Sequence, residues 1–312
     1  MGEDIFFYLF MGEVFLIIAF AFILENRKNK KANSVKKEKN KNLSEESKNK
    51  LDRIIEIVKN KTKTTAYKFV CEESNDIDIY SSKLGGLPYW DSSIEYPQDK
   101  DGNKMPLLAQ INFGEEKLND NRLPDKGILQ FFIATDDLNG LYSGGYKVVY
   151  HENVKSDIIK EDIEKLNIPT SLTLDINKEE YFPFNEEYKI TFNKEEDFIG
   201  TATYGFEDEI KEAIRKEFNE EVTTDLYEYF NKEEHHYLMD AFDSSGHKIF
   251  GYPFFTQYDP REKDDKYDTL LLQIDTDGKI MWGDSGVGNF FINSKDLKEK
   301  NFSDVLYNWD CY

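Results

Sequence analysis

Cysteine is scarce in this sequence, which contains only Cys71 and Cys311. Two cysteines cannot build the disulfide framework of a small secreted domain, and residues so far apart do not have the spacing of a zinc-binding pair. A reducing compartment therefore fits the sequence, although one disulfide between the two cysteines stays open.

The common nucleotide and metal motifs are also missing. There is no phosphate-binding P-loop, no dinucleotide-binding glycine pattern and no His-Glu-x-x-His pair, and the chain has only four histidines. The stretch WGDSGVG (282–288) resembles the nucleophile region of trypsin-like proteases, but no histidine lies in the Ala-Ala-His-Cys context of that family. We interpret the stretch as a glycine-rich turn, and we predict no cofactor and no metal.

Basic residues are too few to balance the acidic ones. The chain has 40 Lys and Arg against 61 Asp and Glu, a net charge of −21, and the excess of acids lies after residue 50. An acidic body repels phosphate backbones, so we predict that nucleic acid is not a partner. The same charge is compatible with an ordinary soluble surface or with an acidic face that binds a basic protein.

One long apolar run is present, from Ile5 to Leu24, and Glu13 is its single charged residue. About 20 apolar residues suffice for a helix to cross a bilayer, and basic residues follow this run in 26–43. The pattern predicts a transmembrane anchor in 1–25, a basic linker in 26–43 that can rest on anionic lipid, and a globular domain in 44–312. We therefore expect a single-pass protein of the cell membrane whose domain is cytoplasmic.

The globular part is rich in aromatic residues, which make up 15% of the chain, and it repeats several of its own phrases. LGGLPYW (84–90) and IFGYPFF (249–255) share a Gly-x-Pro-aromatic pattern, and LLAQIN (107–112) resembles LLLQID (270–275). GILQFFIATDDL (127–138) resembles GVGNFFINSKDL (286–297). The repetition predicts two related halves, at about 83–138 and 248–297, each containing strands covered on both faces.

Helical patterns lie before and between these halves. Ser44 is a candidate helix cap, and Leu51, Ile54, Ile55 and Val58 follow at helical spacing. An insert at about 151–234 contains further helical patterns in 156–169 and 206–218. The stretch LLLQIDTDGKIMWG predicts a hairpin in which residues 279–282 return as a strand. The predicted class is α+β, with a mainly antiparallel sheet built from two pseudo-repeated halves, flanked by helices and preceded by one transmembrane helix.

The richest candidate site is the loop HKIFGYPFFTQYDPR (247–261), because aromatic and polar residues at strand ends commonly line binding sites. We predict a groove between the two halves that binds a ligand or a protein. Its apolar walls would be Trp90, Tyr252 and Trp282. Its polar contacts would come from His247, Gln257, Asp259, Arg261 and Asp284. An immunity or scaffold protein, and an enzyme using His247 with Asp259 or Asp284 as acid and base, stay open as alternatives.

Several phrases together resemble the YwqG-like family of bacterial proteins. They are KLGGLPYW, PLLAQINF, LPDKGILQFFI, GYPFFTQYDPR, YDTLLLQID, MWGDSGVGNFFI and LYNWDC, in order from about Lys83 to Cys311. The resemblance implies an α+β fold with internal similarity. It implies no reaction, because the family is a domain of unknown function.

Overall fold

The computed structural model describes residues 43–263 and 265–312, which fall into two compact units. The described part of the smaller unit comprises residues 43–56 and 221–241. The larger unit comprises residues 57–220 and 242–312, apart from residue 264. The larger unit contains the whole sheet and both copies of the repeated phrases.

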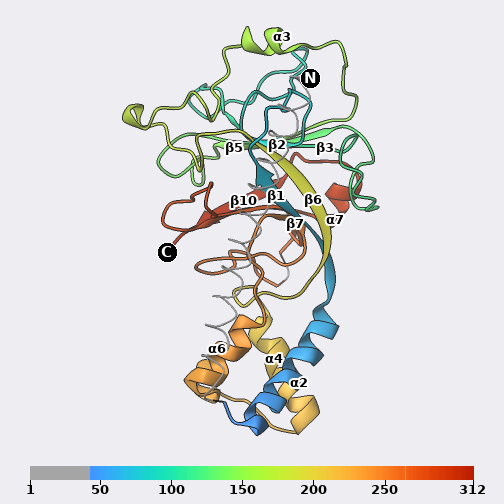
Figure 1. Cartoon of the computed structure of the whole chain (residues 1–312), viewed down its shortest axis with the longest axis vertical. Helices are drawn as coiled ribbons and strands as arrows, with labels where there is room; N and C mark the ends of the chain where they lie inside the picture. The colour runs from blue at the N-terminus through green and yellow to red at the C-terminus, as the bar shows by residue number, and fades with distance from the viewer. Residues whose placement is uncertain (1–42, 264) are drawn as a thin grey trace, which may run out of the picture. The chain divides into compact units, whose positions relative to one another are not determined.

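Ten antiparallel strands form a single sheet in the order β10-β9-β8-β7-β1-β6-β2-β3-β4-β5. The strands are β1 (Thr64–Glu72), β2 (Lys83–Leu84), β3 (Leu107–Asn112), β4 (Ile128–Ile133), β5 (Tyr146–His151), β6 (Tyr188–Asp197), β7 (Lys248–Phe250), β8 (Thr269–Asp275), β9 (Val287–Ile292) and β10 (Val305–Asp310). The long strands β1 and β6 pair at the centre, and Figure 1 shows them running between β2, β3 and β5 on one side and β10 on the other.

The sheet curls until its two edge strands meet, so that it is nearly closed. Tyr146 of β5 donates a hydrogen bond from Oη to the carbonyl oxygen of Val305 in β10, at 3.1 Å. The rings of Tyr146 and Tyr307 lie 5.2 Å apart. The curl brings the two edge strands against each other, whereas a flat sheet would leave both edges open to pairing with another chain.

Several strands are buried on both faces. In β4 and β9 every residue is buried, as predicted for strands covered on both faces. One face packs into the main core, where Phe131 meets Phe290 with ring centroids 5.0 Å apart. The opposite face of β3 and β4 is covered by a cluster around Trp90, Tyr96 and Phe132.

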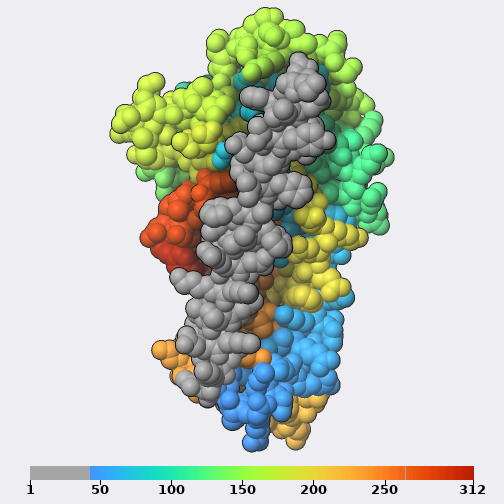
Figure 2. Space-filling model, in the orientation of Figure 1, coloured from blue at the N-terminus to red at the C-terminus, as the bar shows by residue number. Residues whose placement is uncertain are grey.

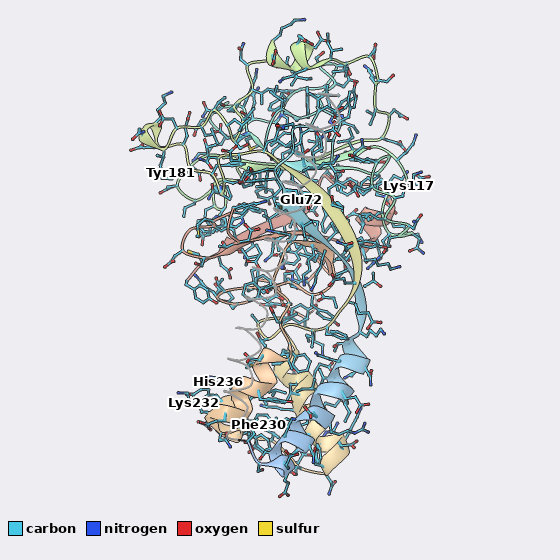
Figure 3. The ribbon with its side chains drawn as sticks, in the orientation of Figure 1. Glu72, Lys117, Tyr181, Phe230, Lys232 and His236 are labelled. Atoms are coloured by element: carbon cyan, nitrogen blue, oxygen red, sulfur yellow. The ribbon has the colours of Figure 1, made fainter. Side chains whose placement is uncertain are left out.

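Helices make up the smaller unit and lie between strands in the larger one. They are α2 (Glu45–Thr62), α3 (Lys160–Glu164), α4 (Phe206–Phe218), α5 (Leu226–Tyr229), α6 (Lys232–Asp240) and α7 (Ser294–Lys298), with a short 3-10 helix at Ile176–Lys178. The predicted cap of α2 is confirmed, because Ser44 Oγ accepts a hydrogen bond from the Ser47 amide at 3.0 Å. Phe230, Lys232 and His236 of the smaller unit are labelled in Figure 3.

The predicted fold class is wrong in how it arranges sheet and helices. The strands form one nearly closed sheet, and α5, α6 and α2 up to Glu56 belong to the smaller unit and not to the unit that contains the sheet. Amphipathic spacing shows that a helix has a face to bury, but it does not show what covers that face. Two local predictions are also wrong, because residues 279–282 form no strand and α3 is much shorter than 156–169.

The predicted membrane localisation is not supported either. In the stretches 43–263 and 265–312, no helix combines the length and the apolar character needed to cross a bilayer. The predicted anchor in 1–25 and nearly all of the basic linker in 26–43 lie outside the described residues. The prediction of a single-pass membrane protein is therefore withdrawn.

Candidate functional site

The Gly-Pro-aromatic loop after β7 has a conformation that depends on a glycine. Phe250 and Gly251 both adopt positive φ, at 63° and 75°. A Cβ on Gly251 would overlap the carboxylate of Asp197, so glycine is required for this close approach. Asp197 Oδ2 accepts hydrogen bonds from the Tyr252 amide at 2.8 Å and from Lys248 Nζ at 3.0 Å. The buried carboxylate thus fixes the loop next to β6.

Two strand side chains hold Phe254 of this loop, and one of them also holds the segment before β7. Gln273 Oε1 accepts from the Phe254 amide at 2.7 Å, and its Nε2 donates to the carbonyl oxygens of Ser244 and Gly246 at 3.1 and 2.7 Å. Asn289 Nδ2 donates to the Phe254 carbonyl at 2.9 Å. These buried amides satisfy loop backbone groups that would otherwise lose their hydrogen bonds.

The loop before β3 is held by corresponding contacts. Gln110 Oε1 accepts from the Tyr89 amide at 3.0 Å, and its Nε2 donates to the carbonyl oxygens of Ile79 and Ser81, both at 2.9 Å. Gln130 Nε2 donates to the Tyr89 carbonyl at 2.6 Å. The glutamine shared by LLAQIN and LLLQID therefore has the same task in each phrase, which is to anchor a Gly-x-Pro-aromatic loop.

A cavity of about 560 Å³ opens beside the second loop, and we call it the Tyr252 cavity. This volume lies within the range of small-molecule sites. The lining combines hydroxyls, aromatic rings and charges of both signs. It includes Thr62, Thr64, Arg122, Thr203, Tyr204, Asp208, Glu209, Phe250, Gly251, Tyr252, Arg261, Lys263 and Asp268.

Arg122 is held in this cavity by a carboxylate and a ring. Its Nε and Nη2 donate to the two oxygens of Asp120 at 2.8 and 2.7 Å, and its guanidinium lies 3.8 Å from the centre of the Phe250 ring. The guanidinium keeps the pKa of Asp120 below its usual range. With Nε and one Nη2 hydrogen engaged, the Nη1 hydrogens face no hydrogen-bond acceptor in the described residues, and the side chain is 39% exposed.

Arg261 is held in the same way but is more deeply buried. Its Nε and Nη2 donate to Asp259 at 2.9 and 2.8 Å, and its Nη1 donates to the Tyr267 carbonyl at 3.1 Å. The guanidinium lies 4.1 Å from the centre of the Phe291 ring. Both arginines line the cavity. The aspartate of an Asp-x-Arg turn and a neighbouring aromatic ring fix the orientation of each planar guanidinium.

The sequence from 82 to 311 matches the family model described as Domain of unknown function (DUF1963). The chain belongs to the DUF1963 family. A search of curated proteins gave no match. The matched range contains both Gly-x-Pro-aromatic loops and both arginines, whereas Thr62 and Thr64 of the Tyr252 cavity precede it.

In this DUF1963 domain, three of the predicted site residues meet. Tyr252 and Arg261 line the Tyr252 cavity, and Asp259 orients Arg261. Gln257 lies in a different place, where its Nε2 donates to the Cys311 carbonyl at 2.8 Å beside a cavity of about 190 Å³. The predicted loop is thus divided between two cavities.

His247 is buried and has partners other than the ones predicted for an acid–base pair. Its Nδ1 accepts from the Asp275 amide at 3.0 Å, and its Nε2 lies 3.1 Å from Asp277 Oδ2. The hydrogen bond with His247 lowers the pKa of Asp277 to about 2. The ring also stacks on Phe69, with centroids 5.3 Å apart. These contacts tie the start of β7 to the end of β8.

The two predicted tryptophan walls lie in separate packed clusters. Trp90 is 2% exposed and meets Tyr96 and Phe132, whereas Trp282 is fully buried in the main core. Asp284 is exposed on the turn that follows Trp282. The structure therefore does not bring Trp90, Trp282 and Asp284 together with Tyr252.

Arg122 is a candidate site residue that the sequence analysis missed. Its local sequence DNR (120–122) parallels DPR (259–261), and both form the same Asp-x-Arg contact. That repeated spacing was the available signal. Among the described residues, no group of three or more His, Cys, Asp or Glu side chains is arranged to hold a metal ion.

Proposed function

We propose that this DUF1963 domain is a small-molecule-binding module whose ligand occupies the Tyr252 cavity. The observation that carries the proposal is the pair of arginines in its wall, each fixed by a bidentate aspartate and an aromatic ring. Fixed donors lose little freedom when a ligand binds, so they favour specific recognition. The cavity volume and the mixed apolar and polar lining agree with this function.

The chemistry of the wall favours a ligand that carries a carboxylate on a planar body. The Nη1 hydrogens of Arg122 can donate to a carboxylate, and Lys263 adds positive charge to the same wall. Tyr204 and Tyr252 offer rings for the planar part of the ligand. Asp208, Glu209 and Asp268 also line the cavity, so the ligand's carboxylate has to meet the donors of Arg122 and Lys263 rather than these acids.

Benzoate is a suitable probe for this proposal, and saturation-transfer NMR with the full chain can follow its binding. We expect saturable binding to the wild-type chain. Arg122→Gln removes a charged donor and should weaken binding about tenfold or more. Arg122→Lys keeps the charge but loses the fork, and it should also bind more weakly.

Arg215→Gln provides the matched control, because Arg215 is exposed on α4 and lies outside the lining of the Tyr252 cavity. It should bind benzoate as the wild type does. Thermal melting of each variant would exclude loss of folding. Equal binding by Arg122→Gln and the wild type would contradict the proposal, and so would the absence of saturable binding to the wild type.

The other functions raised by the sequence stay predictions. They are a protein with an acidic face for a basic partner and an enzyme of unrecognised class. The narrower resemblance to the YwqG-like family also stays a prediction. The cavity favours small-molecule binding over these because its lining is concave, mixed in polarity and already oriented.

A further inference from the structure

A second cavity, of about 390 Å³, lies beside the first Gly-x-Pro-aromatic loop, and we call it the Lys83 cavity. Five apolar side chains line it together with eight polar or charged ones. The lining is Ile77, Asp78, Ile79, Lys83, Leu87, Lys160, Glu164, Asn167, Ile168, Thr170, Leu172, Thr173 and Glu187. Much of this wall comes from the chain between β5 and β6, which is the yellow-green surface at the top of Figure 2.

Lys83 is a buried amine that lines this cavity with incomplete hydrogen bonding. The residue is 1% exposed. Its Nζ donates to the Asp78 carbonyl at 2.7 Å, whereas Glu187 Oε2 lies 3.6 Å away, beyond hydrogen-bond distance. An ammonium has three hydrogens to donate, so the group has capacity for a ligand. Burial lowers the pKa of Lys83 to about 8, which makes the neutral amine accessible near physiological pH.

Lys248 occupies the corresponding position before the second loop and provides an internal comparison. It pairs with Gln273 across the ladder as Lys83 pairs with Gln110. Its Nζ makes a direct ion pair with Asp197 at 3.0 Å, and it lines neither of the two cavities. Lys248 is therefore a structural lysine, whereas Lys83 lines a cavity and its nearest carboxylate oxygen, Glu187 Oε2, lies 3.6 Å from Nζ.

We propose that Lys83 is a reactive amine that binds small apolar carbonyl compounds in this cavity and condenses with them to an imine. The apolar side chains of the wall, such as Ile79, Leu87 and Ile168, would contact the body of the ligand, and Lys83 Nζ would meet the carbonyl carbon. This site is separate from the Tyr252 cavity and does not depend on the function proposed for it.

The condensation balances without an oxidant or a reductant. The nitrogen lone pair of neutral Lys83 attacks the carbonyl carbon, and a carbon–nitrogen bond forms as the carbonyl π bond breaks. The two amine hydrogens leave with the carbonyl oxygen as water, and the carbon–nitrogen double bond remains. Glu187, within 3.6 Å of Nζ, is placed to take a proton from the nitrogen and return it to the departing hydroxyl.

Reductive trapping tests this proposal on the full chain. The protein would be treated with benzaldehyde and cyanoborohydride, digested, and each benzylated lysine quantified by mass spectrometry. Lys298 is an exposed lysine of α7 and serves as the reference, while Lys248 serves as the buried control. We expect Lys83 to be labelled at least about tenfold faster than Lys298 at neutral pH, because burial lowers the pKa of Lys83 to about 8. We expect Lys248 to remain unlabelled.

The pH profile gives a readout that simple accessibility would not produce. Labelling of Lys83 should be half-maximal near pH 8. Glu187→Gln removes a charge that raises the pKa of Lys83, so its profile should shift to lower pH. Glyoxylate, a charged aldehyde, should favour Lys298 over Lys83. If benzaldehyde labels Lys83 no faster than Lys298, the proposal of a reactive amine is overturned. If glyoxylate prefers Lys83 over Lys298 as strongly as benzaldehyde does, the apolar ligand class is overturned.

Discussion

At the scale of single residues, Gly251 and Gly246 show two different reasons why a position requires glycine. Both have positive φ, at 75° and 94°. A Cβ would overlap the Asp197 carboxylate at Gly251 but would meet nothing within 4 Å at Gly246. Gly251 is therefore required both by its positive φ and by the close approach of the carboxylate, and Gly246 is required by its positive φ alone.

Alanine substitutions at these two positions should differ in stability. Gly246→Ala carries the cost of placing a side chain at positive φ, while Gly251→Ala also displaces the carboxylate that holds Tyr252 and Lys248. We expect Gly251→Ala to lower the free energy of unfolding by about 1–3 kcal/mol more than Gly246→Ala does. Urea denaturation of both variants would measure the difference, and equal losses would contradict this role of Asp197.

His151 should make the stability depend on pH. Burial among Gln130, Tyr89 and Trp90 lowers its pKa to about 4. The unfolded group titrates near pH 6.5, so between pH 6.5 and 4 the unfolded chain binds more protons than the folded one. The stabilisation is complete above pH 6.5 and decreases as the pH falls toward 4. The total change should be about 3 kcal/mol.

Variants of two histidines isolate this contribution. His151→Gln should flatten the dependence of unfolding free energy on pH between 6.5 and 4, relative to the wild type. His236→Gln changes an exposed histidine, labelled in Figure 3, and should keep the wild-type dependence. Denaturant unfolding at several pH values would decide. If the unfolding free energy of His151→Gln depends on pH as that of the wild type does, His151 is not the source of the pH dependence.

Single residues also show where sequence reasoning about the site was limited. The sequence indicated that Tyr252, Asp259 and Arg261 share a polar aromatic loop, and in the structure Tyr252 and Arg261 line one cavity while Asp259 orients Arg261. Trp90 and Trp282 follow similar motifs, yet both are buried in packing clusters. Composition cannot distinguish an aromatic ring that lines a cavity from one that fills the core, because both are apolar and lie near loops.

At the scale of elements, Gln273 connects strand β8 to the loop beside the Tyr252 cavity. Gln273→Leu would remove the hydrogen bond accepted from the Phe254 amide of that loop and the two donated to the Ser244 and Gly246 carbonyl oxygens before β7. Leaving such groups unpaired costs about 1–3 kcal/mol each, so we expect a loss of at least about 2 kcal/mol and weaker benzoate binding. Gln257→Leu, at a more exposed glutamine with one side-chain bond, is the control. Equal melting temperatures of the two variants would refute this anchoring role.

The elements differ in how well the sequence predicted them. Helix α4 was predicted with its observed bounds because its apolar spacing is strong, and α2 begins at its predicted cap. The predicted strand at 279–282 does not form, because the chain turns at Asp277 and continues through Trp282 into a further turn. The backbone of Met281 pairs instead with Pro183, a contact that no local pattern could indicate.

At the scale of the whole molecule, the sequence did not reveal how the sheet closes. Closure depends on contacts such as Tyr146 with Val305 and Trp309 with Leu138, between residues far apart in the chain. Alternation and apolar runs specify which residues are buried, but not which edge strand meets which. The predicted flanking helices were a reasonable way to cover the sheet, but the sheet covers much of its own apolar surface by curling.

Native mass spectrometry of the full chain, released gently from its source cells, tests the central claim most directly. If the Tyr252 cavity binds a small carboxylate, the wild-type chain should carry a small-molecule mass that Arg122→Gln lacks and Arg215→Gln retains. A bare wild-type chain, or the same added mass on Arg122→Gln, would contradict binding in this cavity.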